Sequence, residues 1–296
     1  MDNRDEVKAF LSTRRAKLTP EQAGLAHYGR NRRVTGLRRS EVADLAGVSV
    51  EYYARLERGN LSGVSESVLD ALARALQLDE AERAHLADLA RAAGPAARVR
   101  RTPPAQLRPS VARILAGMTE VPAIVNNGRL DVLAANPLGV ALFAPVFADS
   151  ARPANHARFT FLDPRARDFW LDWERAADDA VATLRLEAGR DPFDKALTDL
   201  VGELSTRSDA FRVRWAAHDV RLHRTGVKHF HHPVVGDLHL DYEVMELPAD
   251  PGLSLIAFSA EGGSSADDSL RFLASWAATH HRADALTPPE GGLTVD

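Results

Sequence analysis

The chain has 296 residues with 37 basic and 41 acidic side chains, a formal net charge of −4, and no cysteine. The absence of cysteine excludes thiol nucleophiles, thiolate metal sites and a disulfide framework. With 45% hydrophobic and 26% charged residues, the composition is that of a globular protein of about two domains. No apolar run approaches the roughly 20 residues that span a bilayer, and the charged N-terminus lacks a signal-peptide core. We therefore expect a cytoplasmic protein with no membrane partner.

The charge is distributed unevenly along the chain. Residues 1–101 carry 18 basic and 14 acidic side chains, a net charge of +4, which leaves −8 on residues 102–296. Within the first part, residues 14–39 hold eight basic side chains against Glu21 alone. Such a run forms either a solvated charged surface or a nucleic-acid contact. The sequence that follows the run favours the nucleic-acid contact.

The first hundred residues predict a series of short helices. Apolar spacing and capping residues predict five helices. The first three cover residues 7–15, 39–46 and about 50–58, the fourth starts at Ser65 or Ser67, and the fifth runs from Asp79 to about Ala93. Gly47 ends the second of these helices, and Ser49 is the N-cap of the third. Residues 94–109 are rich in proline and arginine and predict an exposed linker. We assign residues 1–93 to an all-α domain.

The remainder of the chain mixes strands and helices. Asn126-Asn127-Gly128 lies between two apolar runs and predicts a hairpin, and Pro137 opens a short helix. Apolar periodicity predicts long helices over 168–188 and 195–204, and a last helix over 269–279. Strands are expected over 227–232, 238–247 and 253–259. This order predicts an α+β domain over 110–282, an antiparallel sheet with inserted helices, and a tail over 283–296.

Residues 37–57 have the order that a helix-turn-helix requires. Ala43 is small where two helices cross, Gly47 can adopt the left-handed conformation of the turn, and Tyr53 and Leu56 supply apolar packing. The second helix then fits a DNA major groove, so residues of its first turns face the base edges and Arg55 pairs with guanine. A plain helical hairpin inside a bundle is the alternative interpretation, and the basic run upstream argues against it. The predicted DNA-contacting residues are Arg32, Arg33, Arg38, Arg39, Ser49, Val50, Glu51, Tyr52 and Arg55.

This region resembles a known family. The segments Ser40-Glu41-Val42-Ala43, Ala46-Gly47-Val48-Ser49 and Leu56-Glu57-Arg58-Gly59 closely match the Xre/Cro-type helix-turn-helix regulators. The resemblance implies a lambda-repressor-like domain of five helices that binds double-stranded DNA. Paired half-sites on DNA would add discrimination, so we also expect a homodimer.

The second domain carries no recognisable catalytic motif. We find no nucleophile elbow, phosphate-binding loop, zinc-protease motif or dinucleotide fingerprint, and we expect neither enzymatic activity nor a cofactor. Histidines are the exception, because His229 and His231 would share one face of a strand. The full histidine cluster is His218, His223, His229, His231, His232 and His239. We expect no metal there, but a metal-dependent hydrolase built on this histidine cluster, with the first domain as a DNA tether, is the alternative function.

Aromatic residues gather in the segment between the predicted strand pairs, where they form either plain core or the wall of an apolar pocket. The region also resembles the MmyB-like ligand-binding domain. The matching segments include Val125-Asn126, Asp131 to Asn136, Leu184-Arg185, His218-Asp219-Val220 and His232-Pro233. The resemblance implies a PAS-like fold and a sensor of a small apolar ligand, with long-chain fatty acids as the first class to test.

Six residues are the candidate ligand contacts of this domain. Arg185 or His218 would meet a ligand carboxylate, although an internal acid is an equal partner for Arg185. The candidates are Phe169, Trp173, Arg185, Phe211, Trp215 and His218. The sequence thus predicts a DNA-binding regulator of transcription whose DNA affinity depends on a small ligand.

Overall fold

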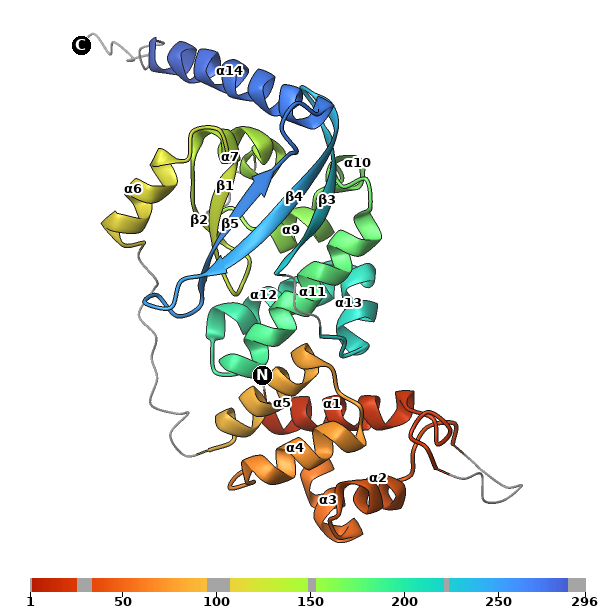
Figure 1. The fold of residues 1–296 in the computed structure, drawn as a ribbon. Helices are drawn as coiled ribbons and strands as arrows, with labels where there is room; N and C mark the ends of the chain where they lie inside the picture. The colour runs from red at the N-terminus through yellow and green to blue at the C-terminus, as the bar shows by residue number, and fades with distance from the viewer. Residues whose placement is uncertain (1, 26–33, 95–106, 149–152, 221–223, 287–296) are drawn as a thin grey trace, which may run out of the picture. The chain divides into compact units, whose positions relative to one another are not determined.

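The computed structural model describes residues 2–25, 34–94, 107–148, 153–220 and 224–286, with side chains as far as residue 279 (Figure 1). The chain forms two compact units: residues 1–103 together with 177–222, and residues 104–176 together with 223–296. Most of the predicted linker, most of the predicted tail, and His223 lie outside the described residues. Within the described part, no helix has the length and apolarity needed to cross a bilayer.

The first unit begins with the expected series of helices: α1 (Asn3–Lys17), α2 (Arg39–Ala46), α3 (Val50–Glu57), α4 (Glu66–Ala75) and α5 (Glu80–Ala92). Their boundaries follow from local chemistry. The Ser49 hydroxyl accepts a hydrogen bond from the Tyr52 amide at 3.1 Å, and Asp79 and Glu82 form a capping box at the start of α5. The predicted caps of α3 and α5 are therefore confirmed.

A second group of helices completes this unit. They are α11 (Trp173–Arg190), which belongs to the unit from Ala177 onward, α12 (Lys195–Arg207) and α13 (Asp209–Ala216). Leu186 of α11 and Val220 belong to the same buried apolar cluster as Val7, Phe10 and Leu11 of α1. Segments nearly two hundred positions apart in the sequence thus share one core.

The single long helix predicted over 168–188 is wrong at its start. The chain forms the short helix α10 (Ala166–Phe169), leaves helical geometry at Trp170, and enters α11 at Trp173. The Leu171 amide donates to the carbonyl oxygen of His229 at 3.2 Å, and the Asp172 carboxylate accepts from the Arg175 amide at 3.1 Å. Pairing with a strand and a side-chain cap together outweigh the apolar periodicity here.

The second unit contains a five-stranded antiparallel sheet of order β2-β1-β5-β4-β3 (Figure 1). The strands are β1 (Ala123–Asn127), β2 (Val132–Ala135), β3 (Thr225–His232), β4 (Gly236–Glu246) and β5 (Leu253–Ser259). The hairpin predicted at Asn126-Asn127-Gly128 joins β1 and β2. The Asn127 side chain holds this turn, because its Oδ1 accepts from the amides of Arg129 and Asp131, both at 3.0 Å.

Helices cover parts of both faces of the sheet. Leu115 of α6 (Pro109–Gly117) packs with Val125 and Leu255. On the other face lie α7 (Pro137–Leu142), α8 (Ala144–Phe147), α9 (His156–Leu162) and α10, with Phe143 contacting Phe230 and Phe258 of the sheet. The last helix, α14 (Ser265–Leu286), contacts α7 and β4. Phe143, Phe169 and Trp170 therefore face the sheet, whereas Phe211 and Trp215 of the same segment belong to the other unit.

Candidate DNA-binding and ligand-binding sites

Helices α2 and α3 form the predicted helix-turn-helix. Gly47 lies between them with φ +66°, in the left-handed region, and the amide of Val48 donates to the Ala43 carbonyl at 3.0 Å. Ala43, Tyr53 and Leu56 are fully buried. The turn is thus tight, and the apolar sides of both helices face the core.

The opposite side of α3 is open to solvent. Val50 is 39% exposed, and Glu51 and Arg55 are also exposed, while Tyr52 is half-buried. The guanidinium of Arg55 lies over the Tyr52 ring, 4.8 Å from its centroid. This cation–π contact orients a bidentate donor on the surface that a recognition helix presents to base edges.

The start of α2 carries two exposed arginines. Glu41 accepts a hydrogen bond from the Arg38 amide at 2.6 Å. Arg39 is ion-paired with Glu57 at the end of α3, and this contact raises the pKa of Arg39. Glu57 is buried and also binds Arg15 of α1, with 2.9 Å between Arg15 Nε and Glu57 Oε1. Arg39, one of the predicted DNA contacts, therefore also joins α2 to α3, whereas Arg32 and Arg33 lie outside the described residues.

An aromatic cluster fills the helix-covered face of the sheet in the second unit. Phe143 lies at its centre, with ring centroids 5.2 Å from Phe258, 5.8 Å from Phe230 and 6.4 Å from both Phe169 and Trp170. His156 contacts the same ring at 5.0 Å. We call these six residues the Phe143 cluster.

Two polar atoms in the Phe143 cluster have no hydrogen-bond partner in the described part of the chain. They are Nε1 of Trp170 and Nε2 of His156, and both are buried. Burial lowers the pKa of His156 to about 4, aided by the charge of Lys228, so its ring is neutral at pH 7. A buried unsatisfied donor costs about 1–3 kcal/mol, and a ligand oxygen would remove that cost.

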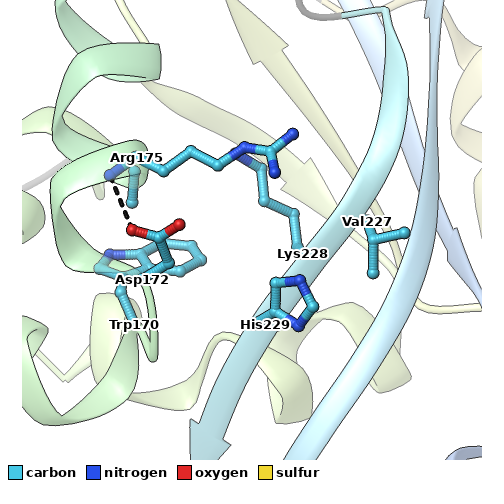
Figure 2. A pocket seen from close by; sticks show the side chains of 7 residues that line it. Trp170, Asp172, Arg175, Val227, Lys228 and His229 are labelled. Atoms are coloured by element: carbon cyan, nitrogen blue, oxygen red, sulfur yellow. Dashed lines mark hydrogen bonds between the residues drawn. The ribbon is translucent and has the colours of Figure 1, made fainter.

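A shallow hollow adjoins this cluster (Figure 2). Its volume is about 10 Å³, room for roughly one water molecule. It is lined by Trp170, Asp172, Arg175, Ala176, Val227, Lys228 and His229, and Figure 2 shows the basic side chains of Arg175 and Lys228 reaching toward one another above Asp172. A hollow of this volume does not hold a long-chain ligand.

The structure distributes the six predicted ligand contacts between the two units. Phe169 belongs to the Phe143 cluster, and the nearby Trp173 donates through Nε1 to the Thr160 carbonyl at 3.0 Å. In the other unit, Phe211 and Trp215 stack with centroids 5.6 Å apart, and Arg185 lies over Trp215 at 4.0 Å. Arg185 and His218 are both bonded to Glu6.

Sequence reasoning missed Trp170 and His156. His156 shortly precedes Phe159 and Trp170 directly follows Phe169, so both lie in the aromatic-rich segment that the sequence marks. A polar ring nitrogen within such a segment was the available signal, but only the fold shows that neither nitrogen has a partner.

The described histidines of the second half do not gather into one site. His229 and His239 are opposite each other on β3 and β4, and His231 pairs with Asp237 at 2.5 Å. His232 is buried and donates to the Ala141 carbonyl at 3.0 Å, while His218 belongs to the other unit. No group of three or more potential metal ligands is found among the residues that the structure describes.

Comparison with protein families assigns both parts of the chain. Residues 13–86 match a helix-turn-helix domain, and residues 107–273 match the MmyB-like transcription regulator ligand binding domain. A search of the curated proteins returned no significant match. The second match covers more than half of the chain, so the protein belongs to the MmyB-like transcription regulators, with a DNA-binding helix-turn-helix domain followed by a ligand-binding domain. These are the domains of a transcription regulator, and nothing indicates a hydrolase.

Proposed function

We propose that this regulator binds duplex DNA as a homodimer in the cytoplasm, and that a long-chain apolar ligand with an oxygen-bearing end changes its DNA affinity. The observation that carries the DNA part is the exposed side of α3, where Arg55 stacks on Tyr52. Val50 and Glu51 share this surface, and Ser49, Arg38 and Arg39 flank it. We propose Arg55 as the guanine-reading residue and Arg38, Arg39 and the arginines at 32 and 33 as phosphate contacts.

Fluorescence anisotropy with a duplex from the region upstream of its own coding sequence tests this assignment. Arg55→Ala should weaken binding by about tenfold and relax preference at one base pair. Arg74→Ala is the matched control, because Arg74 is an exposed arginine of α4. Equal affinities for the two variants would contradict the assignment.

The ligand part of the proposal rests on the Phe143 cluster, which combines an apolar interior with the two unsatisfied nitrogens of Trp170 and His156. A carboxylate or hydroxyl oxygen accepts from the Trp170 N–H, and from His156 Nε2 in the tautomer that carries its proton there, while an acyl chain is the complement of the rings. This face of an antiparallel sheet under helices also fits a PAS-like domain. Phe169 and Trp173 remain proposed contacts, and the ligand would act by binding one DNA-affinity state better than the other.

Palmitate titrations of the full chain test the ligand site. Trp170→Phe keeps a ring and removes the donor, so palmitate affinity should fall by about tenfold, the worth of one hydrogen bond to a charged group. Trp276→Phe on α14 serves as the matched control. Unchanged palmitate affinity in Trp170→Phe, or no effect of palmitate on DNA binding by the wild type, would contradict this part.

A further inference from the structure

Helices α1 and α5 of the DNA-binding domain contact α11 and residues 218–220, which lie within the ligand-binding family match. The apolar part of this contact is the shared core, in which Leu186 and Val220 pack with Phe10 and Leu11. We call the contact the docking face. The apolar contacts alone would not distinguish the docking face from ordinary packing between helices.

The docking face also contains a buried ion pair. Glu6 of α1 binds Arg185 of α11, and Arg185 is fully buried. Arg185 also donates to the Trp215 carbonyl, and its Nη1 lies 2.8 Å from Nδ1 of His218. Burial would raise the pKa of Glu6, but the hydrogen bond with His218 and the charge of Arg185 outweigh it and hold that pKa at about 2. Both charges are therefore present at neutral pH, and each depends on the other for compensation.

A close approach between the backbone of α11 and a side chain of α5 lies beside this pair. Gly189 of α11 faces the fully buried His85 of α5, and a Cβ atom at position 189 would lie 2.5 Å from His85 Nδ1. Real Cβ contacts are essentially never so short, and the His85 ring is held edge-on against Phe10 at 5.0 Å. Glycine is thus required at 189 for α5 to reach α11.

Further ion pairs extend the docking face along α1. Arg14 pairs with Glu82 of α5 at 2.7 Å and with Asp219 at 3.2 Å, and it also donates to the His218 carbonyl. Lys17 pairs with the same aspartate. The polar contacts of α1 with residues 185–219 therefore span most of its length.

The same helix α1 also holds the recognition helix. Arg15 of α1 binds the buried Glu57 at the end of α3, and Glu57 in turn binds Arg39 of α2. Helix α1 thus carries a buried ion pair to α11 near its start and another to α3 near its end. A rigid helix with both attachments transmits a displacement of one to the other.

We propose that the segment 177–222 positions the helices of the DNA-binding domain. It holds α1 through the Glu6–Arg185 pair and the His85–Gly189 contact, and through α1 it sets the position of α3. The segment is thereby an intramolecular partner of the DNA-binding helices. Helix α11 begins at Trp173, in the other unit, so this partner is covalently continuous with the ligand-binding part. The effect on DNA rests on the proposed function, whereas the docking itself does not.

Two glycine-to-alanine variants of the full chain test the proposal. Gly189→Ala places a methyl group against His85, while Gly202→Ala, on α12, adds the same methyl group where no atom lies within 4 Å. Because the chain has no cysteine, Asp70→Cys on α4 and Ala196→Cys on α12 provide exposed sites for one pair of spin labels. Electron–electron distance measurement then reports the docking face without any ligand or DNA.

We expect a narrow distance distribution in the parent and in Gly202→Ala, and a shifted or broadened one in Gly189→Ala. DNA affinity should fall by about tenfold in Gly189→Ala alone, within the usual range of coupling between linked sites. Glu6→Gln, which adds no atom, should change the distances in the same direction, with helical circular dichroism checking that the unit remains folded.

Distances that match between the two glycine variants would overturn the docking, and equal DNA affinities despite changed distances would overturn the link through α1. If the parent itself fails to bind the duplex, the proposed function fails, and the distances still decide the docking.

Discussion

Two buried histidines, one in each unit, are neutral at physiological pH. Burial lowers the pKa of His85 and of His156 from 6.5 to about 4. In the unfolded chain both rings take up a proton near their ordinary pKa, so the unfolded state binds more protons between about pH 6.5 and 4. The free energy of unfolding therefore falls as the pH falls through this window.

His85→Leu should remove the part of this pH dependence that belongs to the first unit. At about pH 5 the wild type should have lost about 2 kcal/mol through His85, and the variant should lack that loss. Near neutral pH the variant should be at least as stable, because it removes two buried nitrogens that have no hydrogen-bond partner in the described structure. Urea unfolding followed by circular dichroism at both pH values measures the difference, with the exposed His231→Gln as control. The same pH slope in His85→Leu and the wild type would refute this account.

Tyr52 is predicted to position Arg55 rather than to bind DNA alone. Its ring lies 4.8 Å from the guanidinium and restricts the conformations of a long side chain. Tyr52→Leu should therefore lower the preference for guanine at the Arg55 base pair by about threefold, while non-specific affinity changes less. Competition anisotropy with guanine and 7-deazaguanine duplexes, which differ in the major groove at the N7 acceptor, measures this preference. Were Tyr52→Leu to weaken all sequences equally, Tyr52 would be a general contact.

At the scale of elements, the turn between α2 and α3 depends on one backbone conformation. Gly47 has φ +66°, and a Cβ there would meet no atom within 4 Å, so the cost of a side chain is conformational only. Gly47→Ala should destabilise the first unit by about 1 kcal/mol. Gly202→Ala, inside a helix with free space, should instead gain a few tenths to about 1 kcal/mol. Thermal unfolding of both variants checks the opposite signs, and a loss of stability in Gly202→Ala would contradict the argument.

Local chemistry made most elements of this fold predictable. Ser49, Gly47 and Asp79 fix helix ends through their own backbone neighbours, and the Asn126-Asn127-Gly128 turn fixes a hairpin, so short sequence windows suffice. The break at Trp170–Asp172 was not predictable in this way. It depends on the His229 carbonyl, which lies far along the chain and comes close only in the folded sheet.

At the scale of the whole molecule, DNA binding should depend steeply on salt. Residues 1–101 carry a net charge of +4 although the chain as a whole carries −4, and exposed arginines lie at the start of α2. Arg38→Ala should lower the slope of log affinity against log salt concentration by about one, the loss of one phosphate contact. Arg74→Ala should leave the slope unchanged. Anisotropy titrations over a range of salt concentrations measure both slopes, and equal slopes would exclude Arg38 from the phosphate contacts.

The candidate sites were predictable only where they are continuous in the sequence. The contacts proposed on α3 come from one helix, so the motif alone gave them. Arg185 had two open partners, a ligand carboxylate or an internal acid, and the acid that binds it is Glu6, 179 positions earlier. No spacing rule connects residues so far apart, and the same holds for His85 and Gly189.

The His85–Gly189 contact has a consequence for building chimeric regulators. Splicing this helix-turn-helix onto a foreign sensor at the proline-rich segment 94–109 would leave the Glu6 carboxylate without Arg185 and the His85 ring without its cover. A transplant that keeps only residues 1–93 should therefore be less stable than one that also grafts residues 177–222. The boundaries at which this protein can be divided for recombination therefore follow its shared core and not the order of its chain.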